Sequence, residues 1–299
     1  RRHRPPQYLY HAKKQPNPFQ KQLSAASAFI IFAALAFVIR LAIAYSLPGY
    51  MTDMDCFKAW AFFFYDWGIS YIYTSDFFAD YPPLYIYALY FLGFLRDAFS
   101  VDITSPLFAM MIRLPAMICD IVAAYAVYRI ARKKLGNTTA LFLSMFLLLK
   151  PAVIFNSSAW GQMDIMLTLM LVLMIWLLVK DRLVWASAVF MLAFLLKPQA
   201  VMLAPLLLYV FIRNIVCSEN KKKGVITLLI SIGVMVGLFF LVPLPFGAGQ
   251  EPDWLISRML GTIGQYPQVT LNAFNLYGML GVNYLDASSL VFLGLGANV

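Results

Sequence analysis

The sequence predicts an all-α membrane protein whose helices cross the bilayer several times. The first observation is the composition: 62% of the 299 residues are hydrophobic, 12% are charged, and the mean hydropathy is +0.75. Soluble domains carry about 25% charged residues. The second is that several apolar stretches reach the roughly 17 to 20 residues that a membrane helix needs. The third is that Lys and Arg cluster between these stretches, as they do in cytoplasmic loops.

The N-terminal segment is basic. Its first 22 residues contain six Lys or Arg and no Asp or Glu, so much of the net charge of +9 lies in a tail. We therefore expect residues 1–23 to form a cytoplasmic tail that contacts anionic lipid, and residues 24–299 to form the membrane module. This location of the charge also argues against a nucleic-acid partner.

Hydropathy predicts about eight spans. Region 183–214 divides into two shorter spans at Lys197-Pro198-Gln199. The longer spans are 24–46, 107–129, 138–156, 163–179 and 225–246. An eighth span starts at Ser288 and is incomplete after twelve residues, and the first residue is Arg, not Met. We therefore expect the chain to be a fragment that lacks further C-terminal helices.

The distribution of Lys and Arg sets the expected orientation. If the tail is inside, the basic cluster at 129–134 must also be inside, so only one full span can lie between residues 47 and 129. The short apolar segment 84–95 is then expected to be a juxtamembrane helix on the outer face. Residues 247–287 become a long outer segment, and the N-terminus is cytoplasmic.

Five polar or aromatic motifs fall on the predicted outer face, although the topology was built without them. They are MTDMDCFKAWA (51–61), FADYPPLY (78–85), NSSAWGQMD (156–164), LLKPQA (195–200) and SRMLGTIGQYPQVTLNAFNLY (257–277). Their convergence at one membrane surface indicates an active site on the extracytoplasmic or lumenal side.

Carboxylates and cations are the chemically useful groups in or beside these motifs. Asp53 and Asp55 are two residues apart, so they diverge on a helix and only one need face a cavity. The other acids and cations are Asp80, Asp164, Lys150, Lys197 and Arg258. A carboxylate base beside cations suits the transfer of a group from a phosphate, because the base accepts a hydroxyl proton and the cations neutralise the leaving phosphate.

A divalent metal bound at residues 53–55 is the alternative to a metal-free base, and we do not favour it. Both histidines lie in the tail, and the three cysteines have no CxxC spacing. We therefore expect neither a cofactor nor a metal site in the membrane module.

Some of these residues also have a structural interpretation. Residues 80–83 suit a turn that opens a helix, since Pro is favoured at the first helical position. Trp160 suits an interfacial aromatic belt. Lys197 can extend its ammonium group to the membrane surface.

Three charged residues are predicted inside the bundle. Arg113 and Asp120 lie seven residues apart on one face of a span, and Arg40 lies in the first span. Charged groups at this depth pair with one another. An ion pair is therefore favoured over a catalytic role for these residues.

The order of the motifs resembles that of the GT-C superfamily of polytopic glycosyltransferases. The pattern is D-x-D after the first span with Trp60 seven residues beyond the first acid, then DYPPL, a WGQ motif with Asp164, and LKPQ. The lumenal dolichyl-phosphate-glucose glucosyltransferases of N-glycan assembly and bacterial relatives of the GPI mannosyltransferases are both similar. The resemblance covers residues 24 to about 280 and implies a GT-C-like bundle with outer-face juxtamembrane helices.

The resemblance implies an inverting transfer of a hexose, mannose or glucose, from a polyprenyl-phosphate donor to an acceptor hydroxyl. Asp53 matches the general base of the family, and Asp55 matches a second acid. Lys197, Gln199 and Arg258 match contacts to the donor phosphate and sugar. Further candidates for substrate or donor binding are the polar residues in or beside the same motifs: Asp80, Tyr81, Trp160, Gln162, Asp164, Lys150 and Asn272.

Two features depart from the family. Gln265-Tyr266 stand where the N-glycan enzymes carry a His-bearing tract, and Lys150 has no counterpart. The contacts to the leaving phosphate therefore do not follow from the resemblance.

A lipid-borne donor also follows from the predicted location of the site. Nucleotide sugars are cytoplasmic, and the sequence contains no nucleotide-binding glycine motif. The expected partners are a polyprenyl-phosphate-linked sugar, a glycan, lipid or protein acceptor, and membrane lipids. The expected location is the bacterial plasma membrane or the endoplasmic reticulum.

A membrane transporter or lipid-linked-sugar flippase is the main alternative function. Transporters usually contain repeats and charged sites near the midplane, whereas most charges here are predicted at one face. A non-enzymatic subunit of a glycan-assembly complex and transfer to a protein side chain also remain open.

Overall fold

The regular structure is helical throughout the part of the chain that the computed structural model describes. This part comprises residues 18–74, 78–218, 220–263, 268–270, 276–282 and 284–286, with one isolated antiparallel bridge between Gln268 and Asp286. The chain divides into two units: unit 1 contains residues 1–62 and 91–179, and unit 2 contains residues 63–90 and 180–299. Two of the boundaries between the units fall in the sequence within the helices α2 (Met51–Trp67) and α3 (Pro83–Ala98).

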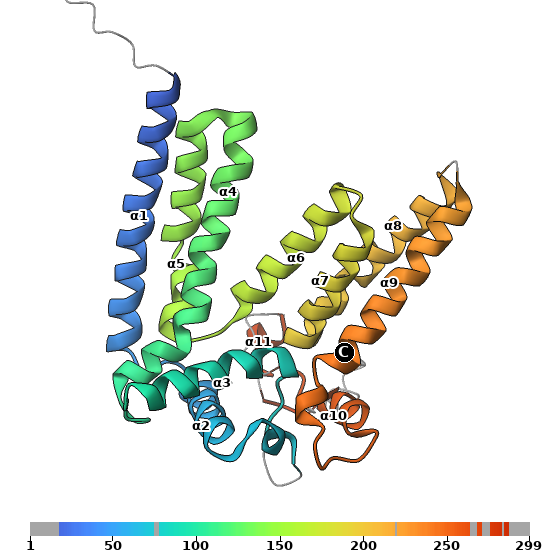
Figure 1. The fold of residues 1–299 in the computed structure, drawn as a ribbon. Helices are drawn as coiled ribbons and strands as arrows, with labels where there is room; N and C mark the ends of the chain where they lie inside the picture. Colours follow the sequence, from blue (N-terminus) through green and yellow to red (C-terminus); the bar gives the residue numbers. More distant parts are fainter. Residues whose placement is uncertain are drawn as a thin grey trace, which may run out of the picture. The chain divides into compact units, whose positions relative to one another are not determined.

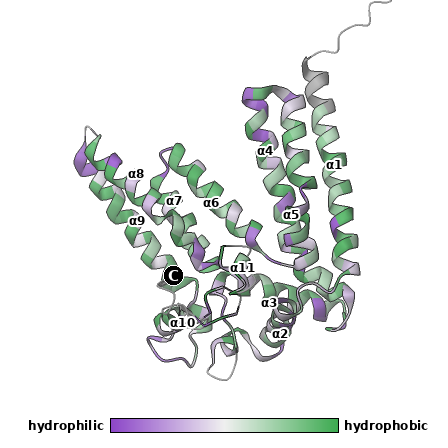
Figure 2. Ribbon diagram, turned by 180° about the vertical axis from the view of Figure 1, so that it is seen from behind, coloured by the Kyte–Doolittle hydropathy of each residue, from purple (hydrophilic) through white to green (hydrophobic). Residues whose placement is uncertain are grey.

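Unit 1 is built around two long apolar helices. α1 (Pro18–Ser46) packs along α4 (Pro106–Leu149), and α6 (Asp164–Val179) also packs on α4. α4 is followed by the short helix α5 (Pro151–Ile154) and a π-helical turn at Phe155–Trp160. The apolar colouring along these helices in Figure 2 is typical of segments that contact lipid.

α4 contains a reversal of chain direction at Gly136, whose φ of 80° and ψ of 170° are not helical. The side chain of Asp120 and the carbonyl of Leu148 both bind the guanidinium of Arg40. A straight helix would separate these two residues by about 42 Å, so the chain must turn back between them, as Figure 1 shows. The two arms correspond to the predicted spans 107–129 and 138–156.

The predicted end of the span 138–156 is wrong. The helix stops at Leu149, and Lys150 is extended, with a φ of −61° and a ψ of 120°. The cause is Pro151, since the residue before a proline is pushed out of the helical region. Beyond this break the chain is helical again, and residues Phe155–Trp160 of the third motif form a π-helical turn.

Four helical stretches of the described residues are long and apolar enough to cross a membrane. They are 25–46, 106–149, 198–216 and 221–246. α6 and α7 (Leu183–Leu196) are apolar but shorter. The predicted helical class is confirmed, while the count of about eight spans stays a prediction.

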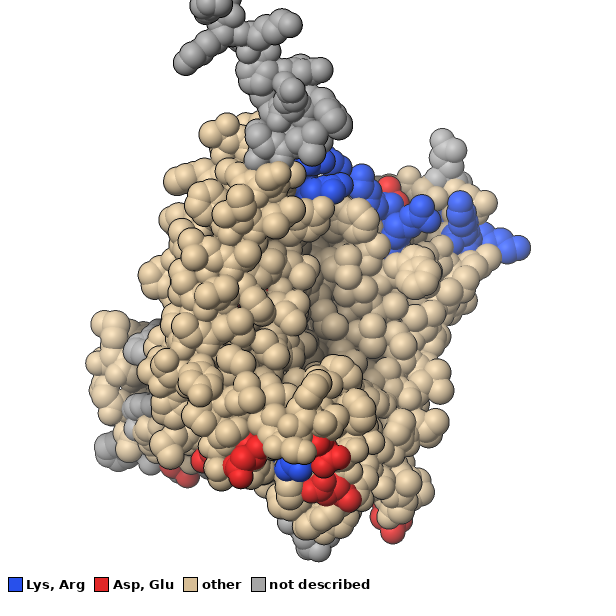
Figure 3. Space-filling view, turned by 60° about the vertical axis from the view of Figure 1, so that its left-hand side comes forward, with Lys and Arg blue, Asp and Glu red and all other residues tan. Residues whose placement is uncertain are grey.

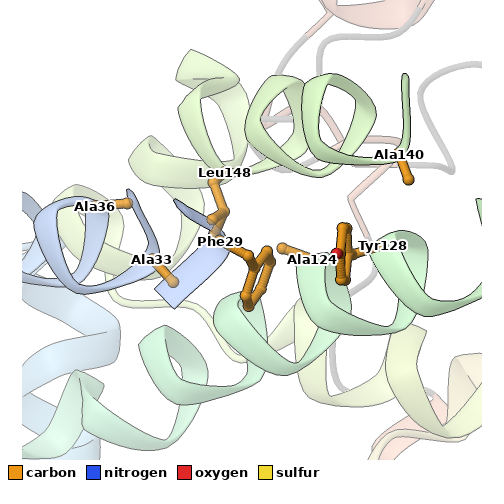
Figure 4. Packing of buried hydrophobic residues seen from close by; sticks show 7 residues of the cluster. All are labelled: Phe29, Ala33, Ala36, Ala124, Tyr128, Ala140 and Leu148. Carbon is orange, nitrogen blue, oxygen red and sulfur yellow. The ribbon is translucent and has the colours of Figure 1, made fainter. Parts of the chain in front are cut away.

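Small and aromatic residues pack α1 against both arms of α4 (Figure 4). Phe29 stacks on Tyr128, with ring centroids 5.3 Å apart and an interplanar angle of 21°. The other buried members of this cluster are Ala33, Ala36, Ala124, Ala140 and Leu148. The alanines let the helix backbones approach closely, as is usual between membrane helices.

Unit 2 contains three apolar helices that pack together. α7 and α8 (Ala204–Val216) both contact α9 (Lys221–Leu241). A 3-10 segment at Pro198–Leu203 separates α7 from α8, so the predicted break at Lys197-Pro198-Gln199 is confirmed. The shorter helical segments of this unit are Ile69–Tyr73, Leu244–Phe246, α10 (Trp254–Ile263) and α11 (Leu276–Met279).

Basic residues precede the reversal in α4 in the sequence. Arg129, Arg132, Lys133 and Lys134 all precede Gly136 closely in the sequence. In Figure 3 most of the basic side chains gather in one band with an acidic patch beside it, and one basic side chain lies among acidic ones elsewhere. Such clustering is typical of the cytoplasmic ends of membrane helices. The orientation itself stays a prediction.

Arg40 and Asp120 form the buried ion pair that the sequence predicts. Arg40 Nε donates to Asp120 Oδ2 at 2.9 Å, and neither side chain is more than 1% exposed. Arg40 Nη2 also donates to the carbonyl of Leu148 at 2.7 Å, and the Ser157 hydroxyl donates to Asp120 Oδ2 at 2.6 Å. The pair therefore links α1 to both arms of α4 and to the π-helical turn. Arg113 is not part of it, because its guanidinium donates to backbone carbonyls.

We expect Arg40→Met to destabilise the protein by about 3 to 5 kcal/mol, because it leaves the Asp120 carboxylate buried without its cation. The measurement is the free energy of unfolding in detergent micelles. The double variant R40M/D120M should recover most of this loss, since it removes both charges.

The matched control is Lys58→Met, which breaks the partly exposed pair between Lys58 and Asp55, whose side chains are 21% and 64% exposed. Its effect should stay below about 1 kcal/mol. Equal losses in R40M and K58M would contradict a structural role for the buried pair.

Candidate functional site

The first turn of α2 carries the predicted pair of carboxylates. Asp53 lies in this turn, where the positive end of the helix dipole stabilises a negative charge. Asp53 is partly buried, whereas the Asp55 side chain is 64% exposed and pairs with Lys58 at 3.3 Å. The two acids therefore diverge, as their spacing predicts.

The side chains of Asp53 and Gln162 meet in unit 1. Gln162 Nε2 donates a short hydrogen bond to Asp53 Oδ2 across a sequence separation of 109 residues. The structure thus brings the first and third predicted motifs together. This contact restrains the carboxylate with a neutral amide, so it does not cancel the negative charge that a proton acceptor needs.

The turn that presents Gln162 is held by its own backbone. The π-helical turn ends at Gly161, which has a φ of 100° and a ψ of 19°. The N–H groups of Gly161 and Gln162 both donate to the carbonyl of Asn156, at 3.1 and 2.9 Å. The Asn156 side chain donates to Asp164 Oδ2 at 3.1 Å. Asp164 therefore braces the turn in which Gln162 lies.

Trp160 and Tyr50 connect this turn to the start of α2. Their rings stack with centroids 4.9 Å apart, and the Tyr50 N–H donates to the Trp160 carbonyl at 2.9 Å. The Met54 N–H in turn donates to the Tyr50 carbonyl at 3.0 Å. Trp160 therefore contacts the residue directly before α2, the helix that carries Asp53.

A second cluster forms around Tyr73 in unit 2. The Tyr73 ring contacts the rings of Phe246 and Trp254, with centroids 5.4 and 5.3 Å away. The Arg258 guanidinium lies over the same ring at 5.5 Å. The Tyr73 hydroxyl donates to the carbonyl of Tyr81 at 2.7 Å. One buried tyrosine thus holds both the predicted cation of α10 and the DYPP motif.

Burial raises the pKa of the Tyr73 hydroxyl well above its ordinary value. Arg258 opposes this shift, and Asp80 adds to it. Tyr73 therefore stays protonated at physiological pH. It acts as a hydrogen-bond donor and as a platform for Arg258, and it is unsuited to be a base.

Tyr81 gives Lys197 a similar platform. The Lys197 ammonium lies over the Tyr81 ring, 5.7 Å from its centroid. Lys197 has an extended backbone at the end of α7 because Pro198 follows it. α3 begins at Pro83, so the helix start expected at this motif is confirmed, and the chain bends at Tyr81 just before it. Four predicted residues, Asp80, Tyr81, Lys197 and Arg258, therefore belong to this cluster.

Four other predicted site residues are not placed in either cluster. Asp55 pairs with Lys58 on the exposed side of α2. Lys150 is exposed at the break between α4 and α5, and Gln199 is exposed in the segment after α7. Asn272 lies outside the described residues.

Three residues of these clusters are not among the site residues that the sequence predicts: Tyr50, Asn156 and Tyr73. Tyr73 lies in a run rich in aromatic residues, and no spacing distinguishes it from its neighbours. Asn156 lies within the motif at residues 156–164, where no residue type or spacing distinguishes it. Gly49 directly before Tyr50 has a φ of 87°, and a glycine at the edge of a motif is the one signal that could have marked this loop.

No group of three or more His, Cys, Asp or Glu that could hold a metal ion occurs among the described residues. Asp53 and Asp55 also diverge, so the triplet 53–55 does not present two carboxylates to one ion. A metal-free reaction stays a prediction.

Comparison with known proteins is informative for the middle of the chain. Residues 98–243 match the family model of the dolichyl-phosphate-mannose-protein mannosyltransferases. This range runs from the end of α3 beyond α9 and includes Gln162 and Lys197 but neither Asp53 nor Arg258. The match supports the GT-C superfamily membership that the motifs predict. No curated protein and no solved structure matches the chain.

We expect Gly161→Ala to be more destabilising than Gly249→Ala. Both glycines have a positive φ, which costs an alanine about 1 to 2 kcal/mol. A Cβ at Gly161 would also lie 2.6 Å from Met54 Sδ, whereas a Cβ at Gly249 would meet nothing within 4 Å. The measurement is the free energy of unfolding in detergent, and equal losses would show that the contact with Met54 adds nothing.

Proposed function

From the support that this match gives to membership of the GT-C superfamily, we propose that the chain is an inverting glycosyltransferase. It moves a hexose, mannose or glucose, from a polyprenyl-phosphate donor to an acceptor hydroxyl, with Asp53 as the general base. The observation that carries the proposal is the hydrogen bond from Gln162 to Asp53. It joins two motifs that are distant in the sequence and holds a partly buried carboxylate in one orientation.

The proposed reaction needs one proton acceptor. Asp53 takes the proton of the acceptor hydroxyl while the hydroxyl oxygen attacks the anomeric carbon of the sugar. The bond from that carbon to the donor phosphate oxygen breaks, and polyprenyl phosphate leaves with the bonding electrons. A phosphate is a good leaving group, so no general acid is required.

The proposed contacts to the phosphate are Lys197 and Arg258. Each cation lies over a tyrosine ring in unit 2. A cation–π contact orients a charge without cancelling it. In the proposed reaction these two cations stabilise the phosphate, which leaves with two negative charges.

We further propose that the reaction takes place on the extracytoplasmic or lumenal side of the membrane. The donor's polyprenyl chain then stays in the bilayer, and the glycan, lipid or protein acceptor arrives from the aqueous side. Basic residues beside the α4 reversal support this orientation, since such clusters are typical of the cytoplasmic side.

We expect Asp53→Asn to lower the release of polyprenyl phosphate by about 10²- to 10⁴-fold, the usual contribution of a general base. The measurement uses purified protein in liposomes with short-chain polyprenyl-phosphate mannose and, separately, glucose. Asp66→Asn is the matched control, because Asp66 is an exposed acid on the same helix. It should leave the rate unchanged.

Release that survives in D53N but is lost in D164N would move the base to Asp164. Movement of the donor across the membrane without release would favour a flippase. No release from either donor by folded wild-type protein, with glycan, lipid and peptide acceptors supplied, would contradict the proposal.

We expect metal chelation to leave the rate nearly unchanged, because a single carboxylate base needs no metal. The measurement is release of polyprenyl phosphate with and without EDTA. Full loss with EDTA and recovery with one divalent cation would contradict the single-base mechanism.

A further inference from the structure

Arg113 is fully buried in the first arm of α4, yet its partners are neutral. Its Nη1 donates to three backbone carbonyls, those of Ala44, Leu47 and Ser158, at 2.9, 2.9 and 3.0 Å. Nε and Nη2 have no hydrogen-bond partner among the described residues. A buried charge usually has a charged partner, as Arg40 has. The cost of burying Arg113 therefore calls for another explanation.

The three carbonyls come from three different segments. Ala44 lies in the last turn of α1, Leu47 lies in the loop before α2, and Ser158 lies in the π-helical turn. Carbonyls at helix ends and breaks lack partners within the helix. One guanidinium therefore satisfies carbonyls at two breaks of the bundle.

Two glycines bring the backbone against the same guanidinium. A Cβ at Gly49 would collide with Arg113 Nη2, and a Cβ at Gly161 would lie 3.3 Å from Nε. Both glycines have a positive φ, of 87° and 100°. The Arg113 guanidinium therefore lies in contact with both the loop before α2 and the turn after the π helix.

These two segments carry the groups of the proposed site in unit 1. Gly49 lies four residues before Asp53, and Gly161 directly precedes Gln162. The hydrogen bond from the Tyr50 N–H to the Trp160 carbonyl joins the segments beside the guanidinium. A shift of either segment would change the distance between Asp53 and Gln162.

We propose that Arg113 is a positioning residue that sets the geometry of Asp53 by clamping the loop before α2 to the turn that carries Gln162. This inference rests on the proposed function. Arg113 has no exposed surface, so it acts through the backbone of these two segments and contacts no substrate.

The test compares Arg113→Met and Arg113→Lys with Phe29→Ala. Methionine removes every donor. Lysine keeps three N–H donors but lacks the planar guanidinium whose Nη2 and Nε lie against Gly49 and Gly161. F29A disrupts the packing of α1 on α4 away from both segments. It therefore shows what a loss of stability alone does to the rate.

We expect R113M to lower kcat for polyprenyl phosphate release by about 100-fold, the effect of a misplacement of about 1 Å. KM for the donor should change less than about threefold, because a base that is out of position weakens the transition state more than the binding of the donor. R113K should be intermediate, and folded F29A should keep its kcat. In the double variant R113M/Q162A the loss should be smaller than the product of the single losses, since both residues act on Asp53.

Hydrogen exchange gives a readout that does not depend on the reaction. The amides of Tyr50 and Met54 should exchange at least tenfold faster in R113M and R113K than in F29A. If R113M does not fold, the kcat and the amide exchange of R113K test the inference. Unchanged exchange and unchanged kcat in a folded variant would overturn the inference.

The outcomes also separate this inference from the proposed function. Faster exchange together with an inactive wild type would overturn the proposed function and support the clamp as a structural link. An active wild type, loss of activity in D53N and normal kcat in R113M would support the proposed function and overturn the positioning role.

Discussion

Backbone groups that are freed at helix breaks inside an apolar bundle must find partners within the protein. Two such breaks in the described part of unit 1 are the loop at residues 47–50 and the turn at the end of the π helix. Each break supplies partners to the other through the Tyr50 N–H and the Trp160 carbonyl, and Arg113 donates to carbonyls of both. The polar side chains of the site can therefore lie beside apolar helices because the two breaks satisfy each other.

The positions of most helices could be predicted from hydropathy, proline and basic residues. The break after α7 and the start of α3 follow from prolines that act within one or two residues. The end of α4 was missed because the apolar pattern continues beyond Lys150, so hydropathy alone does not reveal the interruption. The reversal at Gly136 was anticipated as a gap between two spans, although its contacts with α1 come from residues far apart in the sequence.

The candidate site was predictable only in part. The divergence of Asp53 and Asp55 follows from helical geometry, which is a local property. The contact between Asp53 and Gln162 spans 109 residues, and motif order indicates a shared face but no pairing. The roles of Tyr73 and Arg113 were not predictable, because each depends on carbonyls and rings that only the folded chain brings together. Sequence patterns report periodicity and local breaks, and they do not report these partners.

The Asp, Lys and Arg side chains of this chain have contacts of different kinds. Asp120 binds a cation, Arg40, so the pair is neutral and contributes to the scaffold of unit 1. The bond from Gln162 to Asp53 and the tyrosine rings beneath Lys197 and Arg258 are neutral contacts that orient a charge without cancelling it. Arg113 also has neutral partners, but it has no exposed surface and can act only on the backbone around it. Deep burial therefore assigns Arg40, Asp120 and Arg113 to the fold, whereas Asp53, Lys197 and Arg258 are partly exposed and can meet a substrate.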